Sequence, residues 1–250
     1  MDGQKIIVFG AAKPGIGQAV TNNLLSHGAS VVGVTNPEDL RETEPFRSSN
    51  ANVSWLEVDT FDPTAMVDDL AKIENVNGVV HADMYFYMEK ADSFDIREWN
   101  RSLSANLTVP KVIGYTVKRA WTDTCTSVVF VTSSEANTGS FGAHAYAATK
   151  SAVHNLTKSL ANTAEGKTRY NSLAAGWIGG VMDTDEVFNL SREVTPLGRL
   201  GAPEEIASAA AWLLGDGSSF INGATLYADG GYTGVDTISK YEYNQEFSVS

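Results

Sequence analysis

Short apolar runs alternate with longer amphipathic segments along most of this chain. The runs IIVFG, SVVGV, VSWLEV, GVVH and SVVFVT are rich in valine and isoleucine and have the length of buried strands. Helix-like segments such as GQAVTNNLLSHG separate them. This order is typical of β–α–β units, which build a parallel sheet with helices on both faces. We therefore predict an α/β fold with a doubly wound parallel sheet.

A chain of 250 residues is an ordinary length for one such domain, so no second domain is needed. We expect residues 1–235 to form this domain. The remaining residues, 236–250, are polar with scattered aromatic side chains, and we expect them to form a C-terminal tail. Such a tail either frays or crosses a subunit interface, and the sequence leaves both alternatives open.

Composition excludes several classes of function. A net charge of −12 argues against nucleic-acid binding, because the phosphate backbone repels an acidic surface. No apolar run is long enough to span a membrane and no export signal is recognisable at the start, so we expect a cytoplasmic protein that does not bind membranes. The single cysteine, Cys125, excludes an internal disulfide and a multi-cysteine metal site. No second histidine stands at ligand spacing from His81, so we expect no metal.

The helix-like run from Ser140 to Ala161 contains the pair Tyr146 and Lys150. Residues four apart share a helix face, so the phenol and the ammonium should lie side by side. A unit charge about 4 Å away is worth roughly 4 kcal/mol at an effective dielectric of about 20, and about 1.4 kcal/mol corresponds to one pKa unit. We therefore expect Lys150 to lower the pKa of Tyr146 by about two to three units, making it a usable proton donor and acceptor.

Ser133 follows the apolar run SVVFVT and should end a buried strand, where open parallel sheets bind ligands. The pattern SxxxxxxxxxxxxYxxxK formed by Ser133, Tyr146 and Lys150 resembles the short-chain dehydrogenase/reductase family. A glycine-rich first turn and the segment TPLGRLGAPEEIA, Thr195 to Ala207, support the resemblance, which covers nearly the whole chain. It implies a Rossmann-type sheet of about seven strands and a nicotinamide cofactor.

The glycine-rich turn GAAKPGIG follows the first predicted strand and opens a helix. Backbone amides at such a helix start can hold a pyrophosphate, and glycines let the chain approach it closely. Matched without a gap to the family pattern TGxxxGxG, Gly10 takes the threonine place and Ala11 takes the first glycine place.

The end of the second predicted strand carries Thr35 and Asn36, where the family reads the ribose. Neither a carboxylate favouring NAD nor an arginine favouring NADP stands there. Because Lys13 lies in the glycine-rich loop, we expect NADP(H) to be slightly favoured over NAD(H). Lys13 is alternatively a solvated loop charge. Asp59 matches the aspartate that meets the adenine edge, with a turn or helix-capping role as the alternative.

The resemblance implies further contacts with the cofactor. His81 and Ala82 stand where the family has paired asparagines, and Met84 stands where it has a glycine. After the sixth strand, Gly176 and Ile178 match the segment that meets the nicotinamide. The expected cofactor-binding residues are therefore Gly10, Lys13, Gly15, Ile16, Gly17, Thr35, Asn36, Asp59, His81, Ala82, Tyr146, Lys150, Gly176 and Ile178.

Asn106 matches the family's helix asparagine, which the resemblance implies holds a water for proton relay to the lysine. It completes a catalytic tetrad with Ser133, Tyr146 and Lys150. The segment from Met182 to Val194 is expected to cover the substrate. Aromatic side chains near these positions suggest a bulky substrate, although such side chains also serve packing. The expected substrate contacts are Tyr85, Ser133, Trp177 and Phe188.

Three functional hypotheses follow. The first is a nicotinamide-dependent oxidoreductase that interconverts a carbonyl and an alcohol, with Tyr146 as general acid and base. The second is a non-redox lyase, isomerase or cyclase on the same scaffold, suggested by Ala11, Met84, Ala175 and Gly180 around the cofactor. The third is a catalytically idle nucleotide sensor or interaction subunit. The resemblance also implies a homotetramer or homodimer acting on a small molecule.

Overall fold

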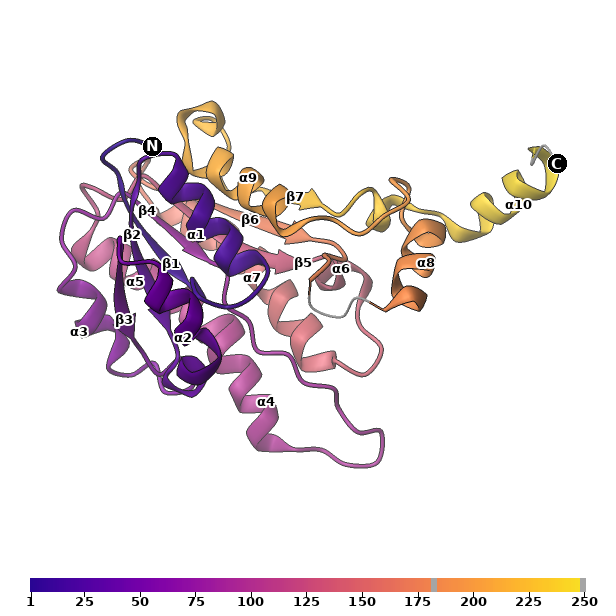
Figure 1. Ribbon diagram of the computed structural model, residues 1–250, viewed down its shortest axis with the longest axis horizontal. Coiled ribbons are helices and arrows are strands. Elements are labelled where there is room, and N and C mark those ends of the chain that lie inside the picture. The colour runs from indigo at the N-terminus through magenta and orange to yellow at the C-terminus, as the bar shows by residue number, and fades with distance from the viewer. Residues whose placement is uncertain (181–183, 248–250) are drawn as a thin grey trace.

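A seven-stranded, entirely parallel sheet runs through the molecule in the order β3-β2-β1-β4-β5-β6-β7 (Figure 1). The structure, a computed structural model, describes residues 1–180 and 184–247. The chain passes from β3 at one edge back to β4 beside β1, so the strand order reverses between β1 and β4. Ligands bind at the carboxyl ends of strands at such a reversal. The predicted fold class is confirmed. The strands are β1 (Lys5–Phe9), β2 (Ser30–Thr35), β3 (Val53–Glu57), β4 (Gly78–His81), β5 (Ser127–Ser133), β6 (Arg169–Ala175) and β7 (Thr225–Ala228).

Helices cover both faces of this sheet. Because side chains alternate along a strand, Ile6 and Val8 of β1 pack toward α1 and α9, whereas Ile7 and Phe9 pack toward α3, α5 and α7. Each face therefore has its own apolar core. The helices are α1 (Ile16–Ser26), α2 (Leu40–Ser49), α3 (Met66–Ala71), α4 (Ile96–Leu103), α5 (Val109–Ala120), α6 (Glu135–Thr138), α7 (His144–Thr163), α8 (Asp185–Val194), α9 (Pro203–Leu214) and α10 (Thr237–Phe247), with a π-helical turn at Ser104–Thr108 and 3₁₀ turns at Pro37–Asp39, Asp216–Ser218 and Tyr232–Gly234.

Two predicted helix starts shift in the structure. The helix expected from Ser140 begins at His144, because Gly142 adopts a left-handed φ of 80° that a helix cannot contain. Asp62 followed by Pro63 is the pattern of an N-cap and a first helical residue and predicts a helix start there, but α3 begins only at Met66. The Asp62 carboxylate accepts hydrogen bonds from the Thr64 backbone and hydroxyl, which makes a turn there first. The run Ala202, Pro203, Glu204 and Glu205 predicts a helix start in the same way, and α9 begins at Pro203.

The C-terminal tail contains a helix. Figure 1 shows α10, in yellow, extending away from the sheet, and its side chains from Thr237 to Ser239 and from Tyr241 to Glu246 are exposed. The Lys240 ammonium donates a hydrogen bond to the Glu193 carbonyl on α8. The tail's last three residues, 248–250, lie outside the described residues. In the part of the chain that the structure describes, no helix is long and apolar enough to cross a bilayer.

Candidate active site

The predicted trio of Ser133, Tyr146 and Lys150 meets at the carboxyl end of β5. Ser133 is the last residue of β5, and the other two lie one turn apart on α7. The Ser133 side chain lies close enough to Tyr146 to affect the pKa of its phenol. The Lys150 ammonium lies 5.5 Å from the centroid of the Tyr146 ring and donates a hydrogen bond of 3.2 Å to the Val131 carbonyl. The arrangement therefore places a phenol, a hydroxyl and an ammonium around one point.

The pKa of Tyr146 shifts in the opposite direction from the sequence-based expectation. Burial raises the pKa of Tyr146, Ser133 opposes the shift, and the negative charge of Glu135 adds to it. Only 7% of the Tyr146 side chain is exposed, so desolvation of a phenolate outweighs nearby charge. The Lys150 ammonium sits beside the ring and binds a backbone carbonyl. The predicted lowering of the pKa is therefore wrong for this structure, and the phenol keeps its proton at neutral pH.

Lys150 is itself perturbed by its surroundings. Burial lowers the pKa of Lys150 to about 8, Asp83 partly opposes this shift, and the positive charge of Lys13 adds to it. The side chain is almost completely inaccessible. Its positive charge is consequently present at neutral pH and is lost in mildly alkaline solution.

Asn106 lies in the π-helical turn between α4 and α5 and is completely buried. Its side-chain oxygen accepts a hydrogen bond of 2.9 Å from the Tyr85 amide, and its side-chain nitrogen donates one of 2.8 Å to the Tyr85 carbonyl. Both ends of the amide therefore fix the segment that follows β4. In this structure the side chain positions that segment, whereas the expected water-relay role remains a prediction.

Met84 and Phe86 cover the catalytic phenol. The Tyr146 hydroxyl donates to the Met84 sulfur at 3.8 Å, and the Phe86 ring packs edge-on against the Tyr146 ring at 5.3 Å between centroids. The bulky Met84, noted as a departure from the family glycine, thus lies directly on the reacting group. A methionine side chain is flexible enough to swing aside, so a substrate carbonyl can take the place of the thioether.

The glycine-rich turn is built for close approach of backbones. Gly10 has a φ of 72°, and a Cβ atom there would come within 2.9 Å of the Asp83 backbone. A Cβ atom on Gly17 would come within 1.9 Å of the Gly10 carbonyl oxygen. The tight turn therefore falls at Gly10, and the match of Ala11 to the first glycine place of the family stays a prediction.

The start of α1 fits a pyrophosphate. Gly15 precedes the helix with a φ of 84°, Ile16 is its first residue, and no side chain caps the amides of the first turn. No acidic residue stands in that turn either. Free amides and the positive end of the helix dipole favour an anion. Gly15, Ile16 and Gly17 are consequently the residues that would hold the phosphates of a dinucleotide.

Lys13 bridges the two loops that flank this helix start. Its ammonium lies 2.7 Å from the Asp83 carboxylate and 3.0 Å from the Asp39 carboxylate, and it donates to the Met84 carbonyl at 3.2 Å. Burial works against the charge, but Asp83 and Asp39 hold the pKa of Lys13 above its usual value. Lys13 is therefore a paired ammonium rather than a solvated loop charge, and its contact with the cofactor stays a prediction.

The residues expected to read the adenosine half have structural partners. Thr35 and Asn36 are buried, and Asn36 donates to the Thr60 hydroxyl at 2.7 Å and accepts from the Glu38 amide at 2.9 Å. Asp59 accepts from the Phe61 amide at 2.8 Å, as its alternative turn role predicts. The side chains of Asn36 and Asp59 are thus occupied within the chain, and the charged groups near the end of β2 include the pair of Lys13 with Asp39 and the pair of Arg101 with Glu38.

His81 contributes to packing at the end of β4. Its ring lies between those of Phe9 and Phe130, with centroid distances of 5.8 Å and 6.5 Å. Burial lowers the pKa of His81 to about 3, and the charge of Lys150 adds to the shift. The imidazole is therefore neutral. Ala82 continues the sheet pairing through a hydrogen bond of 3.1 Å from its amide to the Phe9 carbonyl.

The segment after β6 lies where the nicotinamide was expected. A Cβ atom on Gly176 would come within 2.6 Å of the Asp229 Cα, which explains the glycine. The Trp177 carbonyl and the Gly179 amide pair with Gly201 at 2.9 Å each. These two bonds hold the Ile178 peptide in place but do not involve its own amide or carbonyl. The expected backbone contact of Ile178 with the nicotinamide therefore stays a prediction that this geometry permits.

The expected substrate residues are only partly brought together. Ser133 contacts Tyr146, but the Tyr85 hydroxyl binds Glu98 and its ring packs on Phe61. Trp177 and Phe188 are about half exposed, and no described contact joins either of them to Tyr146. Met182 and Asp183 of the predicted cover lie outside the described residues. Met84 and Phe86, which are not among the expected substrate contacts, are the residues of the segment after β4 that contact Tyr146. The alternation of side chains along the segment is the signal that could have found them.

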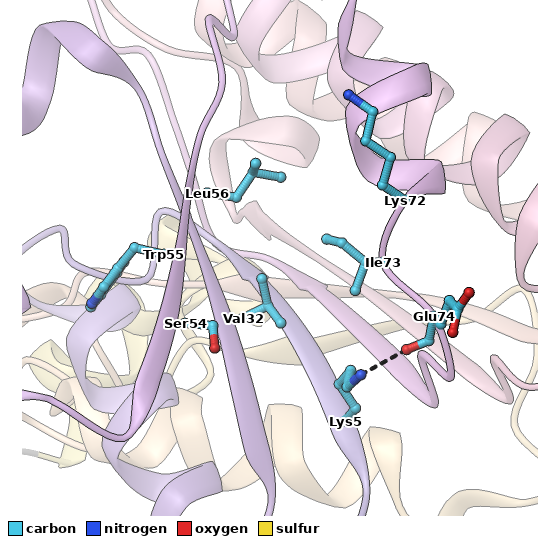
Figure 2. Close-up of a pocket in the computed structure, with 8 residues that line it drawn as sticks. All are labelled: Lys5, Val32, Ser54, Trp55, Leu56, Lys72, Ile73 and Glu74. Atoms are coloured by element: carbon cyan, nitrogen blue, oxygen red, sulfur yellow. Dashed lines mark hydrogen bonds between the residues drawn. The ribbon is translucent and has the colours of Figure 1, made fainter.

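A depression of about 480 Å³ lies between β3 and the turn after α3. Figure 2 shows the residues that line it. Lys5, the first residue of β1, donates a hydrogen bond of 2.8 Å to the Glu74 carbonyl at its rim. The depression therefore lies toward the amino ends of the strands, away from Ser133 at the carboxyl end of β5. It is not part of the site that contains Tyr146.

Comparison with known proteins decides the family. A family model described as enoyl-(acyl carrier protein) reductase matches residues 10–233, nearly the whole chain. The chain belongs to the short-chain dehydrogenase/reductase family. Cis-4-hydroxycyclohexanecarboxylate dehydrogenase of Sinomonas cyclohexanicum is 31% identical to this short-chain dehydrogenase/reductase, over 93% of this chain and 98% of the relative. Gluconate 5-dehydrogenase of Gluconobacter oxydans is also 31% identical, over 93% and 96%.

Solved structures agree with this assignment. The ligand-free aldohexose dehydrogenase of Thermoplasma acidophilum has a TM-score of 0.82 at 25% identity, covering 94% of this chain and 96% of that one. A gluconate 5-dehydrogenase from Beutenbergia cavernae, described as putative and NAD(P)-dependent, has a TM-score of 0.84 at 24% identity, with coverage of 94% and 98%, and shows the same fold. The short-chain dehydrogenase/reductase described here is therefore an NAD(P)-dependent oxidoreductase.

Proposed function

We propose that this short-chain dehydrogenase/reductase reduces a carbonyl compound to an alcohol with Tyr146 as the proton donor. The observation that carries the proposal is a buried, protonated Tyr146 with Lys150 one helical turn away and Ser133 at the adjoining end of β5. The start of α1 fits the phosphates of a dinucleotide. A reduced nicotinamide, when bound, supplies the hydride that the carbonyl carbon accepts.

The three side chains have distinct tasks. Ser133 hydrogen-bonds the carbonyl oxygen and holds it beside the phenol of Tyr146. Tyr146 gives its proton to that oxygen as negative charge develops there, which is general acid catalysis. Lys150 keeps a positive charge below a pH of about 8 and stabilises the phenolate that remains.

Burial favours the direction of reduction. It raises the pKa of Tyr146, so the phenol carries its proton throughout the neutral range. A proton donor must be protonated before the reaction, whereas alcohol oxidation needs the phenolate. Reduction should therefore be the faster direction at neutral pH.

The cofactor preference follows from the charges near Lys13. The expectation of NADP(H) depended on a free Lys13 and on the absence of an acid. Because Asp39 and Asp83 both pair with this ammonium, the local charge is negative overall. A 2′-phosphate would be repelled there, and we therefore propose NAD(H) as the preferred cofactor.

The proposal extends to the oligomeric state, the cellular location and the domain bounds of the protein. Family membership supports a homotetramer or homodimer, located in the cytoplasm, with residues 1–235 as the catalytic domain. The exposed apolar side chains Ile238, Tyr241 and Tyr243 on α10 support contact of the tail with a second subunit.

Product analysis tests this function. The purified protein is incubated with NADH or NADPH and a set of ketones and aldehydes, and both cofactor oxidation and alcohol formation are measured. One alcohol should form for each reduced cofactor consumed. Conversion of the compounds without cofactor oxidation would instead support a lyase, isomerase or cyclase.

A further inference from the structure

The residues from Met84 to Met88 form an extended segment along the start of α7, and alternate side chains face the catalytic helix. Met84 contacts the Tyr146 hydroxyl and Phe86 contacts the Tyr146 ring. The terminal methyl of Met88 lies 3.0 Å from the position a Cβ atom would take on Gly142. Tyr85 points to the other side and binds Glu98. Met84, Phe86 and Met88 therefore make one wall, called here the apolar wall, beside the proton donor.

The apolar wall is open to solvent. The exposed fractions are 42% for Met84, 43% for Phe86 and 57% for Met88. Large apolar side chains gathered on a surface beside a reacting group are typical of a ligand site. Two thioethers and one aromatic ring are polarisable and adapt to the flat faces of ring compounds. This surface suits an apolar ring held next to Tyr146.

Two charged groups near Tyr146, Glu135 and Glu89, are negative, and the positive one, Lys150, is buried. Glu135 raises the pKa of Tyr146 through its charge, and the Glu89 carboxylate lies at the amino end of α7. The Lys150 ammonium is buried and bonded to the Val131 carbonyl. Lys13 reaches the backbone carbonyl of Met84 but is paired with Asp39 and Asp83, and none of the contacts described for the side chains of the apolar wall involves a lysine or an arginine. A substrate carboxylate would therefore meet repulsion here and would lack a cationic partner.

We propose that this site selects uncharged ketones or aldehydes that carry an apolar ring and discriminates against carboxylates. The proposal rests on the carbonyl reduction proposed above. It distinguishes this chain from its relatives that are named for gluconate and for hydroxycyclohexanecarboxylate. Discrimination arises from the negative surroundings of Tyr146, and affinity arises from the apolar wall.

A matched pair of substrates tests the proposal. The ketone 4-oxocyclohexanecarboxylate and its methyl ester share one ring and differ in one charge. We expect kcat/KM for the ester to exceed that for the acid by about tenfold, which corresponds to about 1.4 kcal/mol. Equal or faster turnover of the acid would overturn the selectivity and leave carbonyl reduction standing. Failure to reduce any carbonyl compound would instead overturn the proposed function.

A charge placed on the apolar wall provides a second test. The exposed Met88 can be replaced without disturbing the core, so Met88→Lys should fold. This variant should shift the ratio of kcat/KM values toward the acid by about tenfold, because the new ammonium pairs with the carboxylate. The uncharged Met88→Gln variant should leave the ratio unchanged. Equal shifts in both variants, or none in Met88→Lys, would contradict the inference.

Discussion

The Glu89 carboxylate accepts a hydrogen bond of 2.7 Å from the backbone amide of Ala145, one residue before Tyr146. Its second oxygen lies 3.0 Å from the Nδ1 atom of His144, and its amide donates to the Gly142 carbonyl. The helix α7 has no cap of its own, because Ala143 stands at its N-cap position. A carboxylate from the β4–α4 segment therefore caps the catalytic helix.

Removing this cap should loosen the catalytic helix. Glu89→Ala should lower the free energy of unfolding by about 1 kcal/mol, and Glu89→Gln should lower it less because an acceptor remains. In the alanine variant kcat should fall more than KM rises, since the cap positions Tyr146. Denaturant unfolding and steady-state kinetics measure both effects. Lys90→Ala, at the exposed neighbouring position, is the control, and an equally stable and active Glu89→Ala would disprove the role.

Acid should destabilise the protein through His81. Burial lowers the pKa of His81 from 6.5 to about 3, so the unfolded chain binds a proton in this interval and the folded chain does not. Stability therefore falls as the pH drops below about 6.5. Between about pH 6 and about pH 4, wild type should lose roughly 2 kcal/mol more than His81→Phe, whose ring suits the aromatic surroundings. Parallel stability curves for the two proteins would show that His81 is not the cause.

Reduction should slow in alkaline solution through Lys150. The pKa of Lys150 is lowered to about 8, so the ammonium loses its proton above this pH and no longer stabilises the phenolate. The rate of ketone reduction should fall accordingly. In Lys150→Arg the cation persists at every accessible pH, so any remaining activity should not show this fall. A fall at the same pH in the arginine variant would assign it to another group.

The cofactor preference should depend on Asp39. Asp39→Asn removes one of the two carboxylates that pair with Lys13, which leaves the ammonium freer to bind a 2′-phosphate. The ratio of kcat/KM values for NADPH and NADH should rise by about tenfold, or about 1.4 kcal/mol. Asp69→Asn on α3 removes the same charge at a distance and should change nothing. An unchanged ratio in Asp39→Asn would place the selectivity elsewhere.

Much of the fold could be predicted because burial on both faces leaves a plain pattern in the central strands. The run Ser127–Ser133 is buried throughout and is continuously apolar in its middle. The edge strand β7, Thr225–Ala228, was not predicted because it is short and half-buried, and its pattern is weak. The helix in the tail was missed for the same reason, since α10 has no apolar stripe against the body.

The site was predictable in its members but not in its energetics. Spacing along a helix placed Tyr146 beside Lys150, as the structure confirms. The direction of the Lys150 ammonium depends on the Val131 carbonyl, and the pKa of Tyr146 depends on Met84 and Phe86 above it. Val131 lies on β5, and Met84 and Phe86 lie in the segment after β4, so all three come from outside α7. The spacing of residues along one helix carries no information about contacts with other elements. The predicted direction of the Tyr146 pKa shift is therefore wrong.

The measurement that tests the account most directly is the turnover of Tyr146→Phe with a ketone that wild type reduces. Loss of the phenolic proton should lower kcat by at least about a hundredfold. Cofactor affinity, followed by NADH fluorescence, should stay close to that of wild type. Tyr115→Phe, the same substitution at an exposed tyrosine on α5, should retain full activity. Wild-type turnover by Tyr146→Phe would contradict the assignment of Tyr146 as the proton donor.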